Sequence, residues 1–414
     1  MAFSLKDKPP APSGPVIMQV IPSLGAGGAE QGCIDVAAEL ARVGAISIIV
    51  SNGGYRVPEA LRVGTTHIQM NVDSKNPFTI WRNSRKLRKL INRYKVDIVH
   101  ARSRAPAWSC YLACKNSTAR FMTTCHAPYN LKEGFWGRWK QRYNSSIAKG
   151  ERVIAISHFV ADYLRKYYDI DLRNIRVIHR GVALEKFHPT AVSAERMIKL
   201  SREWRLPDGV SIVMMPGRLT RWKGHHVLID AMARLNRPDT VCVLIGSDQG
   251  RKEYREELER TVKQRKLEGQ IRIVDHCNDM PAAYMLATVA VSASIDPEGF
   301  GRIAAEAQAM GRPIVATDHG GSRETIVRGE TGWLVPPNDA EALAKAIEEA
   351  LALDPSHRSV LATHAMAHIA ANFTKDRMTA LTLSVYAELL DENAIRTEGL
   401  KKEPGRSNHI AAAA

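Results

Sequence analysis

Short apolar runs alternate with helical stretches along most of the chain. Near-continuous Val/Ile-rich runs separated by helices are typical of parallel strands buried on both faces. Two successive sets of such runs therefore predict an α/β protein with two doubly wound, Rossmann-like domains. The runs are Val16–Leu24, Ile46–Asn52, His67–Val72, Val96–Ser103, Arg120–His126, Arg152–Ser157, Arg173–Gly181, then Ser211–Leu219, Val241–Ser247, Gln270–His276, Val289–Ser294, Arg312–Asp318 and Gly332–Pro337.

The rhythm of strands is interrupted near Pro189, where a charged helical stretch follows. We therefore place a domain boundary at about Thr190 and expect polar, disordered tails at both ends. In chain order the predicted parts are a tail, an N-terminal domain, a C-terminal domain, a final helix that can return to the first domain and a second tail: residues 1–14, 15–190, 191–373, 374–391 and 392–414.

The composition of the 414 residues, 45% hydrophobic and 24% charged, is that of an ordinary globular protein and excludes a disordered or collagen-like chain. The sequence contains no run of ~20 apolar residues, and its start lacks the apolar stretch of a secretory signal. We therefore expect a cytoplasmic protein. Its six scattered cysteines form no CxxC pair and are expected to be buried thiols rather than disulfides or metal ligands.

Positive charge is concentrated in the N-terminal half. The first 190 residues hold 29 Lys+Arg and 13 Asp+Glu, whereas the remaining 224 hold 29 and 30. This asymmetry favours an acidic partner for the first half: an anionic membrane, a phosphorylated substrate or a nucleic acid.

Glycine turns follow the first predicted strand of the chain. In the segment Gly25–Glu30, Gly27 and Gly28 would let a phosphate or a sugar approach the backbone and the N-terminus of the next helix. A nicotinamide-binding domain would need an acid at the end of the second strand, but that strand ends at Asn52. A dehydrogenase is therefore disfavoured.

Two charged motifs follow strands of the second domain. In Pro216–Gly224, Arg218 and Lys223 flank a turn that opens a helix, an arrangement that suits a diphosphate. In Glu298–Glu306, Glu298 lies in a loop, whereas Glu306 lies inside a small, apolar helix and needs a partner. Ribose hydroxyls or a structural arginine would each satisfy it.

With these motifs in order, the sequence resembles the retaining glycosyltransferases of family 4 over about residues 16–390. The resemblance implies the GT-B fold, in which two Rossmann-like domains face each other across a cleft. The matching motifs are Gly27–Glu30, Pro216–Gly224, Glu298–Glu306, Thr317–Glu324 and Gly329–Asp339.

The resemblance implies transfer of a hexose, such as mannose, glucose or N-acetylglucosamine, from a nucleoside-diphosphate donor. It assigns the donor diphosphate to Arg218 and Lys223, the ribose to Glu306 and the hydroxyls of the transferred sugar to Glu298. It further implies donor contacts from the backbone of Gly27, Gly28, Phe300 and Gly301, and a histidine at the reaction centre, His126.

No cofactor and no metal ion is needed if Arg218 and Lys223 stabilise the leaving diphosphate. The DxD-like triplet Asp169–Asp171 lies away from the other motifs and is not expected to bind a metal. Asp275 stands where family members commonly have glycine, near the expected nucleobase pocket, so both UDP and GDP remain open.

The helical stretch Ile80–Lys95 is basic and contains no acid. Its cations form either a solvated face over an ordinary core helix or a peripheral contact with an anionic membrane; they include Arg82, Arg85, Lys86, Arg88 and Lys89. A second candidate, Phe135–Tyr143, interleaves cations with aromatic residues that include Trp136 and Trp139, a pattern that suits a lipid headgroup or an acidic glycan.

The acceptor is therefore expected to be lipid-linked or phosphorylated, such as a lipopolysaccharide core or another surface glycan. Two alternatives remain. One is a basic nucleic-acid-binding protein, although no recognition motif accompanies the cations. The other is an inactive nucleotide-sugar-binding protein, which the complete set Arg218, Lys223, Glu298 and Glu306 disfavours.

Overall fold

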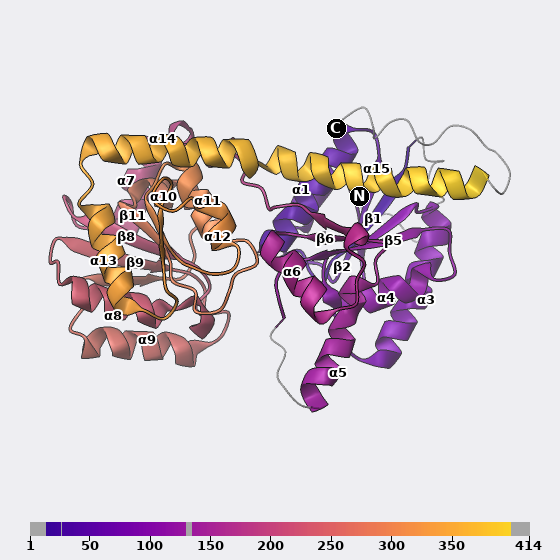
Figure 1. Cartoon of the computed structure of the whole chain (residues 1–414), viewed down its shortest axis with the longest axis horizontal. Coiled ribbons are helices and arrows are strands. Elements are labelled where there is room, and N and C mark those ends of the chain that lie inside the picture. The colour runs from indigo at the N-terminus through magenta and orange to yellow at the C-terminus, as the bar shows by residue number, and fades with distance from the viewer. Residues whose placement is uncertain (1–13, 26, 130–134, 399–414) are drawn as a thin grey trace. The chain divides into compact units, whose positions relative to one another are not determined.

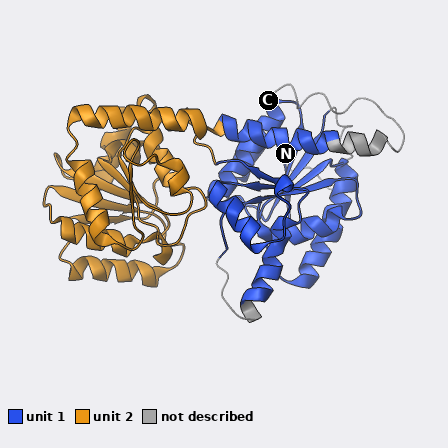
Figure 2. Ribbon diagram, in the orientation of Figure 1, with its two compact units in different colours: residues 1–179, 376–414 blue, residues 180–375 orange. Residues whose placement is uncertain are grey.

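The computed structural model describes the backbone of residues 14–25, 27–129 and 135–398, and the side chains of these ranges except residues 135, 136 and 392–398. The chain divides into two compact units (Figure 1, Figure 2). Unit 1 holds the residues up to His179 and those from Asp376, and unit 2 is Arg180–Lys375. Most of both expected tails and the Trp136 side chain lie outside the described residues.

Unit 1 is built on a parallel sheet with the strand order β3-β2-β1-β4-β5-β6-β7. Its strands are β1 (Val16–Val20), β2 (Ile46–Ser51), β3 (Thr66–Gln69), β4 (Ile98–Ala101), β5 (Arg120–Cys125), β6 (Arg152–Ala155) and β7 (Ile175–Val177). Its helices are α1 (Gly28–Arg42), α2 (Val57–Arg62), α3 (Pro77–Tyr94), α4 (Arg104–Cys114), α5 (Phe135–Asn144), α6 (His158–Tyr167) and α15 (Lys375–Glu398), with the short 3-10 helices η1 (Ser145–Ala148) and η2 (Leu172–Asn174).

Helices cover both faces of this sheet, which is why its strands are apolar throughout (Figure 1). Leu87 and Ile91 of α3 pack with α4 on one face. On the other face Leu40 of α1 shares a core with the C-terminal helix α15, which contributes Tyr386 and Leu389. The chain that left unit 1 at His179 therefore returns to its core through α15.

Unit 2 has a second parallel sheet, in the order β10-β9-β8-β11-β12-β13. Its strands are β8 (Ser211–Pro216), β9 (Thr240–Ile245), β10 (Ile271–Val274), β11 (Val289–Ser292), β12 (Ile314–Thr317) and β13 (Trp333–Val335). Its helices are α7 (Ala194–Glu203), α8 (His225–Leu235), α9 (Lys252–Gln264), α10 (Met280–Leu286), α11 (Arg302–Ala309), α12 (Ser322–Thr325), α13 (Ala340–Leu351) and α14 (Pro355–Asn372), with η3 (Pro189–Ala191) and η4 (Arg221–Lys223). Helices α8, α9 and α13 cover one face, and α7, α10 and α11 cover the other.

The predicted α/β class is confirmed, because every described strand overlaps one of the apolar runs expected from the sequence. All six cysteines are buried with free thiols. No helix among the described residues is both long and apolar enough to span a bilayer.

Two boundaries differ from those expected. The chain enters unit 2 after His179 rather than at Thr190, because the intervening segment packs there. The N–H of Val182 donates to the carbonyl of Phe373 at 2.8 Å, and Phe187 makes an edge contact with Tyr284. In addition, α15 continues to Glu398 instead of giving way to a tail at residue 392. Residues 392–398 are mostly good helix formers, which explains the extension.

Candidate functional site

The strand order of unit 2 locates its ligand site. The order reverses between β8 and β11, and open α/β sheets bind ligands at the carboxyl ends of the strands where this happens. The loops that leave these two strands are residues 217–224 and 293–301. They carry Arg218, Lys223 and Glu298, three of the residues singled out from the sequence.

Close backbone packing holds the two loops together. Gly224 adopts φ 76°, and a Cβ atom there would lie 1.9 Å from the carbonyl oxygen of Ala293. The N–H of Ile295 donates to the carbonyl of Trp222 at 2.8 Å. The position of Lys223 is thus fixed from both sides, and its ammonium also lies 4.5 Å from the centre of the Trp222 ring.

The loops meet in an ion pair between Lys223 and Glu298. The Lys223 Nζ lies 2.7 Å from the Glu298 Oε1, and the two side chains are only 10% and 12% exposed. The hydroxyls of Ser294 and Ser292 donate to the same oxygen at 2.5 and 3.4 Å. Burial opposes ionisation of Glu298, but the charge of Lys223 and these hydrogen bonds outweigh it and lower the pKa of the carboxyl. Glu298 is therefore a carboxylate at neutral pH.

The loop after Glu298 leads into an open helix N-terminus. Gly301, at φ 85°, is the N-cap residue of α11, and no side chain caps the helix. The following strand supports this turn: the N–H of Gly321 donates to the Glu298 carbonyl at 2.9 Å, and a Cβ on Gly321 would collide with the backbone of Phe300. The glycine motif after β12 is thus the support of the Glu298 loop, and the N–H groups of α11 suit an anion.

Glu306 is buried in α11 and already has partners in the protein. Its Oε1 accepts from the Arg302 guanidinium at 2.5 and 3.0 Å, and its Oε2 accepts from the Tyr284 hydroxyl at 3.0 Å. Of the two partners expected for this carboxylate, the structure supplies the arginine. Burial, followed by the charge of Glu306, raises the pKa of Tyr284, so the phenol keeps its proton.

Arg218 contrasts with these paired groups. Its side chain is exposed, and within the described parts of the chain it has no hydrogen-bonding or ionic partner. His225, the first residue of α8 after the same loop, is fully buried. Burial, together with the charge of Lys223, lowers the pKa of His225 to about 4, so the imidazole is neutral at pH 7.

Three predicted residues lie in unit 1. Gly27 is the N-cap residue of α1, without a side-chain cap, and Gly28 opens that helix after β1. His126 directly follows β5 and is half-buried. All three lie at the carboxyl edge of their sheet, as the sequence predicted. Arg102, which sequence reasoning missed, follows β4 at the same edge and is only 2% exposed.

The basic residues of α3 do not form one set. Arg88 is half-buried and donates to the carbonyls of Leu112 and Ala113, at the end of α4. Arg82, Arg85, Lys86 and Lys89 are exposed. On α5, Trp139 is 56% exposed and stacks on Tyr143.

Several supporting residues are not marked by any of the sequence motifs. Ser292 and Ser294 bind Glu298, Tyr284 binds Glu306, and Phe78 and Trp81 are large exposed aromatics at the start of α3. The spacing of Arg302 and Glu306, four residues apart on one helix, was a readable signal of their ion pair.

Comparison with known proteins agrees with this geometry. The family described as "Glycosyltransferase Family 4" matches residues 26–186, and the family described as "Glycosyl transferases group 1" matches residues 197–365. A glycosyltransferase of known structure from Rickettsia africae is 39% identical to this chain with a TM-score of 0.84, covering 91% of this chain and 99% of that one.

More distant relatives are similar over shorter stretches or in fold alone. Anabaena HepE, solved in complex with UDP-glucose, is 21% identical with a TM-score of 0.77, covering 91% of this chain and 99% of its own. A D-inositol 3-phosphate glycosyltransferase from Salinispora tropica is 33% identical over 266 residues, which are 60% of this chain and 53% of that protein. The chain thus spans about half the length of the curated relatives it matches.

Two parallel Rossmann-like sheets, with charged loops at the switch point of the second, are the halves of a GT-B fold. The chain belongs to glycosyltransferase family 4.

Proposed function

We propose that this chain is a retaining hexosyltransferase that uses a UDP- or GDP-linked sugar. The main support for this proposal is the buried Lys223–Glu298 ion pair at the switch point of unit 2. It lies beside the N-terminus of α11, which has no side-chain cap. The UDP-glucose bound by Anabaena HepE supports the donor class. The transferred hexose would be mannose, glucose or N-acetylglucosamine.

Lys223 and Arg218 would hold the donor diphosphate. As the glycosidic bond breaks, the departing nucleoside diphosphate gains negative charge, and a cation already in place stabilises it without reorganisation. Lys223 is positioned by Glu298 and has three N–H donors, so it can bind a phosphate oxygen while keeping this partner. Arg218, exposed at the same loop, would close on the diphosphate as a bidentate donor.

Glu298, because it is ionised, would act as a hydrogen-bond acceptor for hydroxyls of the sugar rather than as an acid. Glu306 would accept a ribose hydroxyl on Oε2, which receives only the Tyr284 bond from the described residues and has a lone pair left. The backbone N–H groups of Phe300 and Gly301 would contact the donor next to them. Each of these contacts uses an atom whose orientation the fold already determines.

From unit 1 we propose three further contacts. Gly27 and Gly28, at the start of α1, would bring backbone N–H groups to a phosphate. His126 would contact the donor sugar at the reaction centre. These roles rest on the position of the residues at the carboxyl edge of the sheet and on the family resemblance.

The proposed acceptor is a lipid-linked or phosphorylated glycan of a surface polysaccharide, such as lipopolysaccharide, at the cytoplasmic face of a membrane. The support is what we call the α3 surface: Phe78, Trp81, Arg82, Arg85, Lys86 and Lys89. The Arg85 guanidinium stacks 3.8 Å from the Trp81 ring, and the Phe78 and Trp81 side chains are 67% and 45% exposed. Exposed aromatic rings among exposed cations suit an anionic headgroup layer.

A thermal-shift panel of UDP-glucose, GDP-mannose and ADP-glucose tests the donor site. A ligand at 100 times its Kd stabilises the folded state by about 2.7 kcal/mol, so the matching donor should raise the Tm clearly. Lys223→Ala should abolish that rise. Lys345→Ala, which removes an exposed lysine of α13, should keep it.

A normal rise in both Lys223→Ala and Glu306→Ala would show that the donor binds elsewhere. With the matching donor and an acceptor extract, NMR of the product should show the anomeric configuration of the donor. Inversion of that configuration would contradict the proposed reaction.

A further inference from the structure

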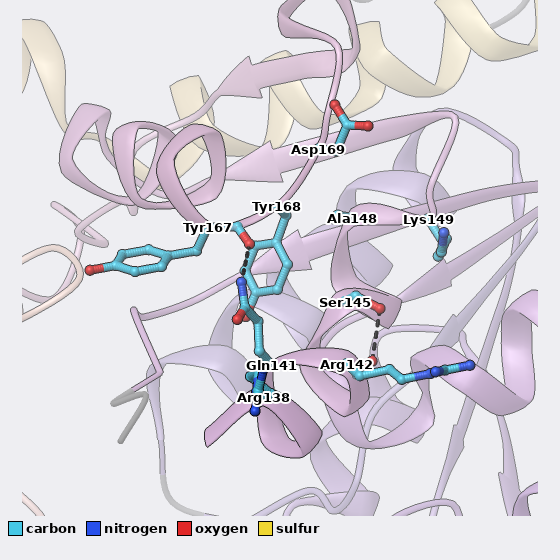
Figure 3. Close-up of a pocket in the computed structure, with 9 residues that line it drawn as sticks. All are labelled: Arg138, Gln141, Arg142, Ser145, Ala148, Lys149, Tyr167, Tyr168 and Asp169. Atoms are coloured by element: carbon cyan, nitrogen blue, oxygen red, sulfur yellow. Dashed lines mark hydrogen bonds between the residues drawn. The ribbon is translucent and has the colours of Figure 1, made fainter. Parts of the chain in front are cut away.

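A hollow in unit 1 that none of the donor motifs uses lies between α5 and α6 (Figure 3). Its volume is about 390 Å³, within the range of roughly 300–1,000 Å³ found for small-ligand pockets. Three cations line it: Arg138, Arg142 and Lys149. Among the residues that the structure describes, none of the three side chains has a carboxylate or hydrogen-bonding partner.

The hollow is at the opposite edge of the sheet from the reaction centre. Lys149 comes just before β6, where the N–H of Glu151 donates to the carbonyl of Phe121 near the start of β5. Asp169 likewise precedes β7. His126, in contrast, follows the end of β5, and a six-residue strand is roughly 20 Å long. A ligand in the hollow is therefore distinct from the donor diphosphate.

The other lining groups indicate more than an anion site. Gln141 donates its amide N–H to the carbonyl of Tyr167 at 2.7 Å, which fixes the side chain and leaves its carbonyl oxygen as an acceptor. Asp169 is exposed at the rim and has no partner within the described ranges. A carboxylate repels an anion but accepts hydrogen bonds from hydroxyl groups. Cations together with fixed acceptors match a ligand that carries both phosphate and hydroxyls.

We propose that this hollow binds a phosphorylated sugar. Arg138, Arg142 and Lys149 contact the phosphate, and arginine suits its oxygens through paired N–H donors. Asp169 and Gln141 accept from the sugar hydroxyls. The site is independent of the donor site in unit 2, so this proposal can be tested separately from the proposed transfer reaction.

Isothermal titration with glucose 6-phosphate, inorganic phosphate and glucose tests the site. The wild-type protein should bind glucose 6-phosphate at least ten-fold more tightly than inorganic phosphate, and glucose should give no heat. Arg138→Ala/Arg142→Ala/Lys149→Ala should weaken glucose 6-phosphate binding at least ten-fold. The control Arg62→Ala/Lys115→Ala removes two exposed cations of unit 1 outside the hollow and should leave it unchanged.

A second variant distinguishes recognition of the sugar from recognition of the phosphate. Asp169→Asn removes an acceptor for the sugar hydroxyls and a charge that repels the phosphate. It should therefore weaken glucose 6-phosphate binding relative to that of inorganic phosphate, whose own binding should stay the same or tighten. The donor-induced Tm rise should persist in every variant, which shows that the fold and the donor site are intact. Equal binding of phosphate and glucose 6-phosphate, or unchanged binding in the triple variant, would overturn the proposal. It would also be overturned if the triple variant lost binding only to phosphatidylglycerol vesicles, since the hollow would then be a membrane contact.

Discussion

The two units share a plan but use charge in different ways. Each is a parallel sheet whose strand order reverses beside its first strand, with helices on both faces. In unit 2 the two carboxylates of the site are paired, Glu298 with Lys223 and Glu306 with Arg302. On the α3 surface of unit 1 the cations are exposed and, within the described residues, have no carboxylate partner. Paired charges fix the geometry for one small ligand, whereas unpaired charges suit a broad anionic surface.

The largest effect on the fold should come from breaking the pair in unit 2. Lys223→Met leaves the Glu298 carboxylate buried without its counter-ion, and losing one partner of such a pair costs about 3 kcal/mol or more. Urea unfolding should show this loss. Lys223→Met/Glu298→Leu should recover most of the stability, because no bare charge remains, but should not recover donor binding.

The pH dependence of stability should reveal the same pair. The folded-state pKa of Glu298 lies below its unfolded value, so its contribution is present above the unfolded pKa, about 4.3. It is lost as the pH falls through the lower folded pKa. The free-energy difference between wild type and Glu298→Gln should therefore be full at pH 7 and shrink below pH 4. A difference that stayed constant across this range would mean that Glu298 is not ionised in the folded protein.

The sequence predicts features that leave a local pattern, but not contacts between residues that are far apart in the sequence. The apolar runs located every described strand, because burial on both faces leaves a local signature. Since carboxyl ends of parallel strands share one edge, the approach of Lys223 and Glu298 was also predictable. The hydrogen bond from the Tyr284 hydroxyl to Glu306 was not predictable. It joins two helices across 22 positions, and such a contact leaves no periodic signal in the sequence.

Tertiary contacts also explain why the environment of Arg88 and the boundary at His179 were not predicted. Arg88 has the helical spacing of the exposed cations, yet it binds carbonyls of α4, a neighbour that only the tertiary fold supplies. The boundary at His179 was hidden because the segment that follows it packs on unit 2 through Phe187, which sequence pattern alone does not place.

A smaller effect is expected at a buried polar contact in unit 1. The Tyr386 hydroxyl of α15 lies 2.7 Å from the His100 Nδ1, whose ring also reaches Thr124 at 2.7 Å. Tyr386→Phe removes this buried hydrogen bond and should cost about 1–3 kcal/mol in urea unfolding. Tyr55→Phe, at a 70% exposed tyrosine, is the matched control and should be neutral. Equal stability of both variants would show that the Tyr386 hydroxyl does not help to hold α15 on unit 1.

The smallest effect per residue is expected on the α3 surface, where the cations should matter for membrane binding and not for folding. Each contributes about 1 kcal/mol near an anionic leaflet, so Lys86→Ala/Lys89→Ala should weaken binding to phosphatidylglycerol-containing vesicles by about 30-fold in co-sedimentation. Its unfolding free energy should stay within about 0.5 kcal/mol of wild type, since both side chains are exposed.

Two controls sharpen this last comparison. Arg62→Ala/Lys115→Ala removes the same amount of charge from unit 1 away from α3 and should bind vesicles normally. Trp81→Ala should weaken binding even at high salt, where screening has removed most of the electrostatic attraction. If the wild-type protein sediments equally little with anionic and neutral vesicles, the α3 surface is only a solvated helix face. The exposed cations of the α3 surface would then have no membrane role. The difference between the two units would be limited to the charges inside them.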